Sequence, residues 1–143
     1  MIFKSYILEQ DLKILDKYKL FLFYGENEGL KEEFKERIRL ANKNLEILNL
    51  FQEEIIKNKN ILINEIINKS LFEEKKLIFN NQASDKIYNI IEDISENIDG
   101  EKIIIFADIL DKKSTIRNHF EKSKIYGIAP CYQDNEITAK KII

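Results

Sequence analysis

The sequence predicts an α/β fold with three layers and a mainly parallel sheet of five strands. Two observations favour this class. Short apolar runs recur along the chain and are continuous rather than alternating, which is typical of strands that helices cover on both faces. The segments between the runs have the spacing of amphipathic helices, so right-handed crossovers can connect the strands. The 143 residues contain no linker or internal repeat, and a single domain, residues 1–143, is expected.

Five apolar runs are predicted to form the strands. The single proline, Pro130, closes the fifth run, because the residue before a proline is biased toward an extended backbone. The runs are KLFLFY (19–24), LEILNLF (45–51), KKLIF (75–79), KIIIFA (102–107) and IYGIA (125–129).

Two amphipathic helices are predicted with their N-caps. Asn27 precedes a helix over residues 28–41, and Ser84 precedes one over residues 84–98. The first helix carries an apolar stripe of Leu30, Phe34, Ile38 and Ala41, and the second carries Ile87, Ile90, Ile91, Ile94 and Ile98.

Three further segments have helical spacing. Residues 52–68 predict one long helix or two short ones, because the turn-prone Asn58-Lys59-Asn60 interrupts the pattern. Asp111 or Ser114 can cap a helix that carries Ile116 and Phe120. The last residues, DNEITAKKII, predict the start of another helix, which suggests a domain cut from a longer polypeptide.

The charge and the reactive residues exclude several classes. A net charge of −2 gives no basic footprint for phosphates, so protein partners are favoured over nucleic acid. One cysteine and one histidine leave no disulfide framework and no zinc site. The amino terminus carries charged residues at Lys4, Glu9 and Asp11, which disfavours the apolar core of a signal peptide. No apolar stretch reaches 18 residues, which disfavours a membrane-spanning helix. A cytoplasmic protein that neither crosses nor binds a membrane is expected.

The stretch FLFYGENEGLKEEF, residues 21–34, has the outline of a phosphate-binding loop. An apolar run leads into a glycine, a polar turn, a second glycine and a helical pattern. The P-loop pattern is G-x-x-x-x-G-K-[ST]. Gly25 and Gly29 are one residue too close for it, and Leu30 follows Gly29 where the lysine belongs.

The charges of this turn also disfavour a phosphate. Glu26 and Glu28 lie in it, and a carboxylate about 4 Å from a phosphate oxygen costs roughly 1 to 4 kcal/mol. Lys31 could offset only part of this repulsion. The prediction is a strand-to-helix turn without a functional P-loop and without a cofactor, and a degenerate nucleotide-binding regulator remains an alternative.

A phosphoacceptor receiver is a second alternative. Asp108 follows a buried strand, as the acceptor aspartate of a receiver does, and Lys112 and Lys113 follow a turn later. Glu26 and Glu28 only loosely imitate the acidic pair of that class. The segment PCYQDN after the fifth strand lacks the required lysine.

Nothing in the sequence predicts nucleophilic catalysis. His119 and Cys131 lie in different elements, and no serine, second histidine or acid completes a catalytic set. A surface histidine and a buried thiol are expected.

The segment NKSLFEEKKLIF, residues 68–79, places Leu71 and Phe72 at a junction that would more usually be polar. Both side chains could pack on the sheet of their own domain. Alternatively they could form an apolar plug for a pocket on a partner, because large apolar side chains dominate the energy of interfaces.

Three stretches together resemble the amino-terminal domain of the delta subunit of bacterial DNA polymerase III, a part of the sliding-clamp loader. LFLFYGENEGLKEE resembles the family's YLLYGED-x-L-hydrophobic-x-E, and SLFEEKKLIF resembles SLF-x-x-[KR]-[KR] before a hydrophobic run. KIIIFADILDKKSTIRNHFEK resembles a strand followed by LDKRSKL-x-K-x-L-x-K. The resemblance runs along essentially the whole chain.

The resemblance implies an AAA+ module of RecA-like topology, the fold of P-loop NTPases, with the strand order 5-1-4-3-2. It also implies a replication function without ATP hydrolysis. The subunit binds the ring-shaped beta sliding clamp and stabilises its open form, other clamp-loader subunits bind the nucleotide, and DNA is contacted only indirectly. The label of DNA-directed DNA polymerase, a nucleotidyltransferase, would belong to the holoenzyme, because no polymerase carboxylates are visible in this chain.

Carried over from the family, the clamp-binding residues are Ser70, Leu71 and Phe72, with the last two entering a hydrophobic pocket on the clamp. The general clamp-binding pattern starts with glutamine, and Ile67 stands at that place here. Full-length family members continue into a helical lid and a collar domain, which residues 1–143 do not include. The resemblance therefore implies clamp binding without stable assembly with the other loader subunits.

Overall fold

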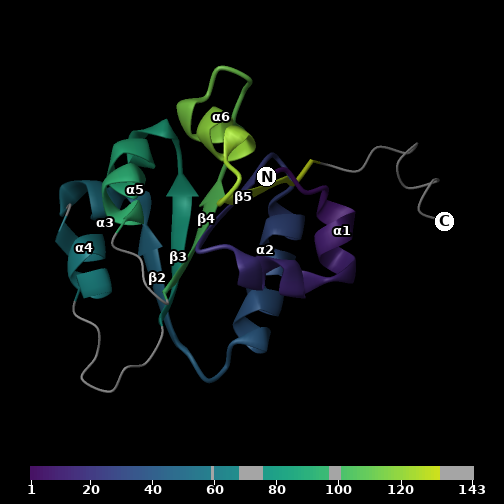
Figure 1. Ribbon diagram of the computed structural model, residues 1–143, viewed down its shortest axis with the longest axis horizontal. Helices are drawn as coiled ribbons and strands as arrows, with labels where there is room; N and C mark the ends of the chain where they lie inside the picture. Colours follow the sequence, from purple (N-terminus) through teal and green to yellow (C-terminus); the bar gives the residue numbers. More distant parts are fainter. Residues whose placement is uncertain (59, 68–75, 97–100, 133–143) are drawn as a thin grey trace.

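The structure of the protein is a computed structural model that describes residues 1–58, 60–67, 76–96 and 101–132. Its single sheet has the strand order β2-β3-β4-β1-β5, and each neighbouring pair is parallel (Figure 1). The strands are β1 (Leu20–Tyr24), β2 (Glu46–Phe51), β3 (Lys76–Ala83), β4 (Lys102–Ala107) and β5 (Gly127–Pro130). The predicted α/β class with a parallel five-stranded sheet is confirmed. Counted from β5, the strands also follow the expected order 5-1-4-3-2, whereas membership of the AAA+ class stays a prediction.

Helices cover both faces of this sheet, which gives three layers (Figure 1). One face is covered by α1 (Ser5–Gln10), the 3-10 helix η1 (Leu12–Lys17) and α2 (Glu28–Ala41). The other is covered by α3 (Gln52–Lys57), α4 (Asn60–Ile67), the short 3-10 helix η2 (Asp85–Ile87), α5 (Tyr88–Ser95) and α6 (Thr115–Lys122).

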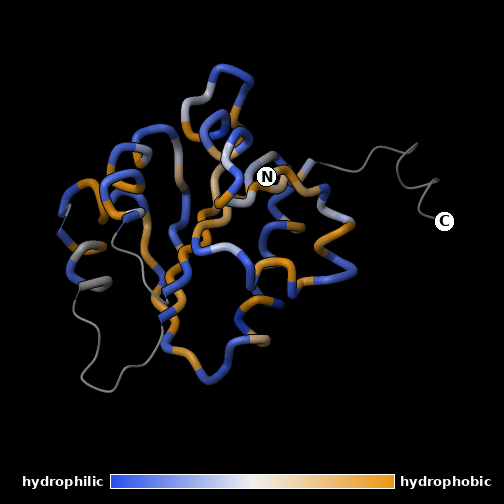
Figure 2. Tube along the Cα trace, viewed as in Figure 1, coloured by the Kyte–Doolittle hydropathy of each residue, from blue (hydrophilic) through white to orange (hydrophobic). Residues whose placement is uncertain are grey.

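The strand β1 lies inside the sheet and is buried along its whole length. Phe21 and Phe23 pack toward α2, while Leu20 and Leu22 pack toward the opposite helices. All four side chains are 0 % exposed, which explains why the run is continuously apolar. Figure 2 shows the same concentration of hydrophobic residues along the central strands.

The strand β2 departs from the prediction that every strand is covered on both faces. It forms an edge of the sheet, and Leu50 is the buried residue among its six. Phe51 at its end remains 41 % exposed. An apolar run shows that a strand is present, but the order of the strands decides how far it is covered.

The helical predictions are confirmed in part. The helix α3 ends at Lys57 and α4 begins at Asn60, so the alternative of two short helices is confirmed. Ser84 accepts a hydrogen bond from the N–H of Lys86 at 3.4 Å and begins the helical segment as predicted. The first turn of this segment is the 3-10 helix η2, which passes directly into α5 and ends at Ser95. The predicted helix within DNEITAKKII lies outside the described residues.

The elements α1 and η1 were not predicted from the sequence. Each is six residues long and has little periodicity of its own. Leu8 of α1 and Leu15 of η1 pack against the face of the sheet that α2 covers, and the two residues are 0 % and 4 % exposed. Tertiary packing therefore stabilises both elements.

The strand β3 continues beyond the predicted end at residue 79, through the polar residues Asn80 and Asn81, to Ala83. A register shift lies between Asn80 and Ala83, and Gln82 has a positive φ of 55°. Asn80 is paired with Leu50 on one side and with Ile105 on the other. Its side chain is 0 % exposed, and within the described ranges its amide nitrogen and oxygen have no hydrogen-bond partner.

Replacing Asn80 with valine is expected to stabilise the protein by about 1 to 2 kcal/mol. Burying an amide without a partner is costly, and valine fits both the strand and its apolar neighbours. Urea unfolding of both proteins measures the difference.

The neighbouring Asn81 provides the matched control for this prediction. Its Nδ2 donates to the carbonyl oxygen of Leu50 at 3.2 Å, and its Oδ1 accepts from Lys35. Asn81→Val should therefore destabilise the protein. A loss of stability in Asn80→Val as well would show that the Asn80 amide is hydrogen-bonded in solution.

Candidate functional site

The turn after β1 lies at the carboxyl edge of the sheet, where parallel α/β folds usually bind their ligands. The N–H of Gly25 donates to the carbonyl oxygen of Asp108 after β4 at 3.0 Å. The N–H of Asn27 donates to the carbonyl oxygen of Cys131 after β5, also at 3.0 Å. The turn is thus tied to the ends of both strands that flank β1.

Asn27 begins α2 as the sequence predicts. Its Oδ1 accepts from the N–H of Leu30 at 3.0 Å, which caps the helix. Its Nδ2 donates to the carbonyl oxygen of Tyr132 at 3.2 Å. One side chain therefore satisfies the helix start and also fixes the chain that leaves β5.

Lys31 has a larger role at the carboxyl ends of the strands than its sequence context predicts. It is 4 % exposed, and its Nζ lies 2.7 Å from Glu28 Oε1, 2.9 Å from the carbonyl oxygen of Ala107 and 3.8 Å from Asp108 Oδ1. Counted from Gly25, Lys31 is the seventh residue, which is the place of the lysine in a P-loop. Counting from Gly29 instead puts Leu30 at that place.

The surroundings of Lys31 already provide the negative charge that a phosphate would bring. Glu28 and Asp108 are carboxylates, and the Ala107 carbonyl oxygen accepts a hydrogen bond from the same ammonium. A phosphate oxygen next to Lys31 would have to displace Glu28 or accept repulsion of roughly 1 to 4 kcal/mol from each carboxylate. The arrangement holds a helix against a sheet and disfavours an anion.

Isothermal titration with ATP and Mg²⁺ is accordingly expected to give no saturable heat at protein concentrations in the micromolar range. The reason is that the buried lysine of the turn is already paired with a carboxylate. Binding with a micromolar dissociation constant would contradict this prediction and favour the nucleotide-binding alternative.

A hollow of about 190 Å³ adjoins Lys31 between α2 and the ends of β2, β3 and β4. Lys35 lines it, and its Nζ lies 5.5 Å from the ring centres of Phe79 and Phe106. Burial lowers the pKa of Lys35 from its ordinary value. Glu28, Glu32 and Asp108 line the same hollow, so charges of both signs share its wall.

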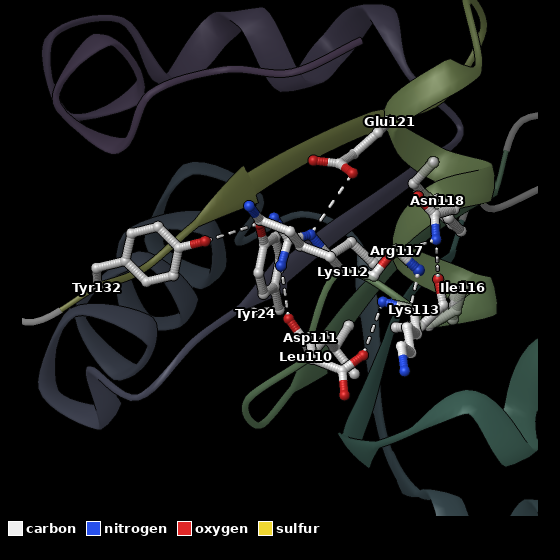
Figure 3. A network of polar contacts seen from close by, with 12 residues as sticks. Tyr24, Leu110, Asp111, Lys112, Lys113, Ile116, Arg117, Asn118, Glu121 and Tyr132 are labelled. Atoms are coloured by element: carbon white, nitrogen blue, oxygen red, sulfur yellow. Dashed lines mark hydrogen bonds and ion pairs between the residues drawn. The ribbon is translucent and has the colours of Figure 1, made fainter.

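Arg117 of α6 orders the loop that follows β4 (Figure 3). Its Nη1 donates to the carbonyl oxygen of Leu110 at 2.8 Å, and its Nε lies 3.5 Å from Glu121 Oε1. The guanidinium carbon lies 5.1 Å from the centre of the Tyr24 ring, and the Tyr24 hydroxyl is 3.1 Å from that of Tyr132. These contacts join β1, the β4 loop and the end of β5.

The start of α6 has two caps. Ser114 Oγ accepts from the N–H of Arg117 at 3.2 Å, as one of the two predicted caps. The other candidate, Asp111, accepts instead from the N–H of Lys113 at 2.8 Å. Asp85 Oδ1 accepts from Ser114 Oγ at 2.6 Å and from the N–H of Ile116 at 3.0 Å. No local pattern indicates this role of Asp85, because its partners lie about thirty residues further along the chain.

Asp108 lies at the end of β4, where the receiver alternative placed its acceptor. Its side chain is 76 % exposed, and its Oδ1 lies 3.8 Å from Lys31 Nζ. The order of the sheet, however, differs from the order 2-1-3-4-5 of the doubly wound fold that receivers share. The strand order therefore argues against a receiver.

His119 and Cys131 lie apart and form no catalytic pair. The expectation of a surface histidine is confirmed in part: His119 is partly exposed and lines an open hollow, and its Nδ1 lies 3.2 Å from the Tyr88 hydroxyl. The expectation of a buried thiol is confirmed, with Cys131 at 0 % exposure. Burial raises the pKa of the Cys131 thiol to about 12, so the thiol stays protonated at neutral pH.

The predicted clamp-binding residues Ser70, Leu71 and Phe72 lie outside the described residues. The described chain reaches the end of α4 at Ile67 and resumes at Lys76, where β3 begins. All the strands are parallel, so the amino end of β3 lies at the amino ends of the strands, whereas the Gly25 turn lies at their carboxyl ends.

The part of the chain that the structure describes contains neither a cluster of metal ligands nor a membrane-spanning helix. No group of three His, Cys, Asp or Glu residues there could hold a metal ion. No helix there is long and apolar enough to cross a bilayer.

The fold and the paired lysine together define the class of this chain. It is an α/β protein with a turn shaped like a P-loop, in which the lysine is already bound by the chain's own carboxylate and carbonyl groups. Comparison with known proteins adds no family to this class, since no protein-family model and no curated protein matches the chain.

Proposed function

We propose that this chain is a clamp-loader domain similar to the amino-terminal domain of the delta subunit of bacterial DNA polymerase III. It binds the beta sliding clamp and helps to open it for loading onto DNA during replication. The work is done by binding energy, without catalysis and without direct recognition of DNA.

The pairing of Lys31 with Glu28 is the observation that carries this proposal. The chain has a strand, turn and helix in the arrangement of a nucleotide-binding loop. The ammonium group of Lys31, however, already donates hydrogen bonds to the Glu28 carboxylate and to the carbonyl oxygen of Ala107. A protein that keeps this scaffold without a free phosphate site uses the scaffold to position other surfaces. Clamp loaders include such a subunit, as the resemblance implies.

The proposed contact is the segment that carries Ser70, Leu71 and Phe72 between α4 and β3. Buried aromatic and aliphatic anchors supply most of the energy of an interface, and phenylalanine alone can bury about 150 to 250 Å². The beta sliding clamp is the expected partner, and the other loader subunits would act through the full-length protein.

Binding of the protein to purified beta clamp of the same species, measured by surface plasmon resonance, tests the proposal. Saturable binding with a micromolar or lower dissociation constant is expected. Bovine serum albumin immobilised at equal density controls for adsorption. Binding to the clamp no stronger than to this control would overturn the proposed function.

A further inference from the structure

The two edges of the sheet differ in their cover. Beyond β5, Ile2 forms a parallel bridge with Ile128, and the N–H of Phe3 donates to the carbonyl oxygen of Ile128 at 2.8 Å. Beyond β2, no part of the described chain pairs with the strand. Within the described ranges, β2 therefore presents outward backbone groups without a strand partner, although the N–H of Phe51 at its end donates to Glu54 Oε1 at 3.2 Å.

The β2 edge also has few of the devices that prevent strand pairing, and Glu46 is the one charged residue among its six. Such edges are commonly blocked by proline, lysine or a bulge. The sequence EILNLF has neither proline nor lysine, and its register with β3 is unbroken from Glu46 to Phe51. The apolar side chains Ile47 and Leu48 are half-buried, and Phe51 is 41 % exposed.

We propose that the outer edge of β2 is a self-association surface, on which β2 of a second copy of this chain pairs in the antiparallel direction. A two-fold axis perpendicular to the sheet would then join two five-stranded sheets into one. Such an interface is isologous, because each copy contributes the same surface.

The side-chain pattern of β2 selects the register. Residues directly opposite in an antiparallel pair lie on the same face of the sheet. Ile47 packs toward α2, and Phe51 lines the hollow beside Lys35, so both lie on the α2 face. Leu48 and Leu50 pack toward the opposite helices. Like faces can pair only if the two-fold axis passes through a residue.

An axis through Asn49 gives matched neighbours along the apolar part of the strand. Ile47 lies opposite Phe51 of the second copy, Leu48 lies opposite Leu50, and the two exposed Asn49 side chains meet at the axis. An axis through Leu48 would instead place Ile47 opposite Asn49 and Glu46 opposite Leu50. The first register buries apolar side chains against one another, and the second does not.

The charges that flank β2 agree with the antiparallel direction. Lys43 precedes the strand, Glu53 and Glu54 follow it, and all three are exposed. Antiparallel pairing brings the Lys43 end of each copy to the Glu53 and Glu54 end of the other, and it leaves Glu46 opposite the uncharged Gln52. Parallel pairing would place each of these charged residues beside its own copy, which is destabilising.

Sedimentation equilibrium from 1 µM to 500 µM tests the association. The surface is small, so a dissociation constant on the order of 10 to 100 µM is expected for the wild type. Asn49→Lys should weaken the dimer at least about tenfold, because it places two like charges next to each other on the axis. Asn58→Lys, which adds the same charge to an exposed position at the end of α3, should leave the dimer unchanged.

A mixture of two charge variants separates a charge effect from a loss of structure. Asn49→Asp should weaken self-association for the same reason as Asn49→Lys, since each variant meets a like charge on the axis. An equimolar mixture of the two should recover dimers at wild-type concentrations, because a lysine then faces an aspartate. Only a residue on the axis meets its own copy, so this recovery also tests the register.

A cysteine placed on the axis gives a second test of the register. Opposite Cα atoms of an antiparallel pair lie about 4.5 to 5.5 Å apart, which a disulfide can bridge. Asn49→Cys should therefore form a covalent dimer on mild oxidation. Glu46→Cys is the matched control, because its own copy lies about 20 Å away along the paired strands. The buried Cys131 should not compete.

Several results would overturn the proposal. The wild-type protein could remain monomeric up to 500 µM, or Asn49→Cys could cross-link no faster than Glu46→Cys. A mixture of Asn49→Lys and Asn49→Asp that associates no more than the separate variants would exclude an axis at this residue. A low-concentration thermal melt of each variant shows that its monomer is folded.

Discussion

Replacing Gly25 with alanine is expected to destabilise the protein by about 3 to 5 kcal/mol. The φ of Gly25 is +124°, a conformation that costs other residues of order 1 to 3 kcal/mol. A Cβ atom at this position would lie 2.2 Å from the carbonyl oxygen of Cys131 and 2.8 Å from its carbonyl carbon. Both strain and overlap therefore oppose the substitution.

The backbone around Gly25 has little room to relax. Its N–H donates to the carbonyl oxygen of Asp108, and the N–H of Cys131 donates to the carbonyl oxygen of Tyr24 at 2.6 Å. Moving Cys131 away from a Cβ atom would break the pairing between the ends of β1 and β5. Guanidinium unfolding followed by circular dichroism measures the loss.

Gly29 supplies the matched control in the same turn. It lies in the first turn of α2, and a Cβ atom there would come no closer than 3.6 Å to its nearest neighbour, Oδ1 of the Asn27 side chain. Gly29→Ala should be neutral or stabilising by up to about 1 kcal/mol, because alanine favours the helix. Equal losses in the two variants would show that the geometry of Gly25 is not what makes its substitution costly.

Replacing both Leu71 and Phe72 with alanine is expected to weaken binding to the beta clamp by about 4 kcal/mol, roughly a thousandfold. Hot-spot anchors lose at least about 2 kcal/mol each on truncation, because the partner's pocket is left unfilled. Surface plasmon resonance against the clamp gives the ratio of the two dissociation constants.

Tyr6→Ala is the control for this second prediction. It removes an aromatic side chain that is 49 % exposed on α1, outside both the proposed clamp segment and the β2 edge. Clamp binding should be unchanged in this variant. If the Leu71 and Phe72 double variant is folded by circular dichroism and binds as the wild type does, the site assignment is wrong.

Local signals account for the elements that were predicted well. The run of β1 and the N-cap Asn27 of α2 are adjacent in sequence, and their side chains act on the same few residues. The break between α3 and α4 follows from turn-prone residues in the same way. Such elements can be predicted from the sequence because the residues that stabilise them lie within the elements themselves.

Distant contacts account for what was missed. The polar end of β3, Asn80 and Asn81, is held in the sheet by its neighbours β2 and β4. Asp85 caps α6 although it lies about thirty positions before that helix in the chain. The candidate clamp segment, in contrast, was found from its sequence and its family resemblance, and it stays a prediction.

The sequence by itself determined the alternation of strand and helix, because periodicity and capping depend on residues within a few positions of one another. The edge position of β2 does not follow from its own apolar run, and was expected only through the strand order that the family resemblance implies. Only the tertiary structure decided that Lys31 is paired. Ala107 lies 76 positions from Lys31 along the chain, and only the order of the strands brings the two together. Contacts over such separations depend on packing in three dimensions, which a local pattern does not encode.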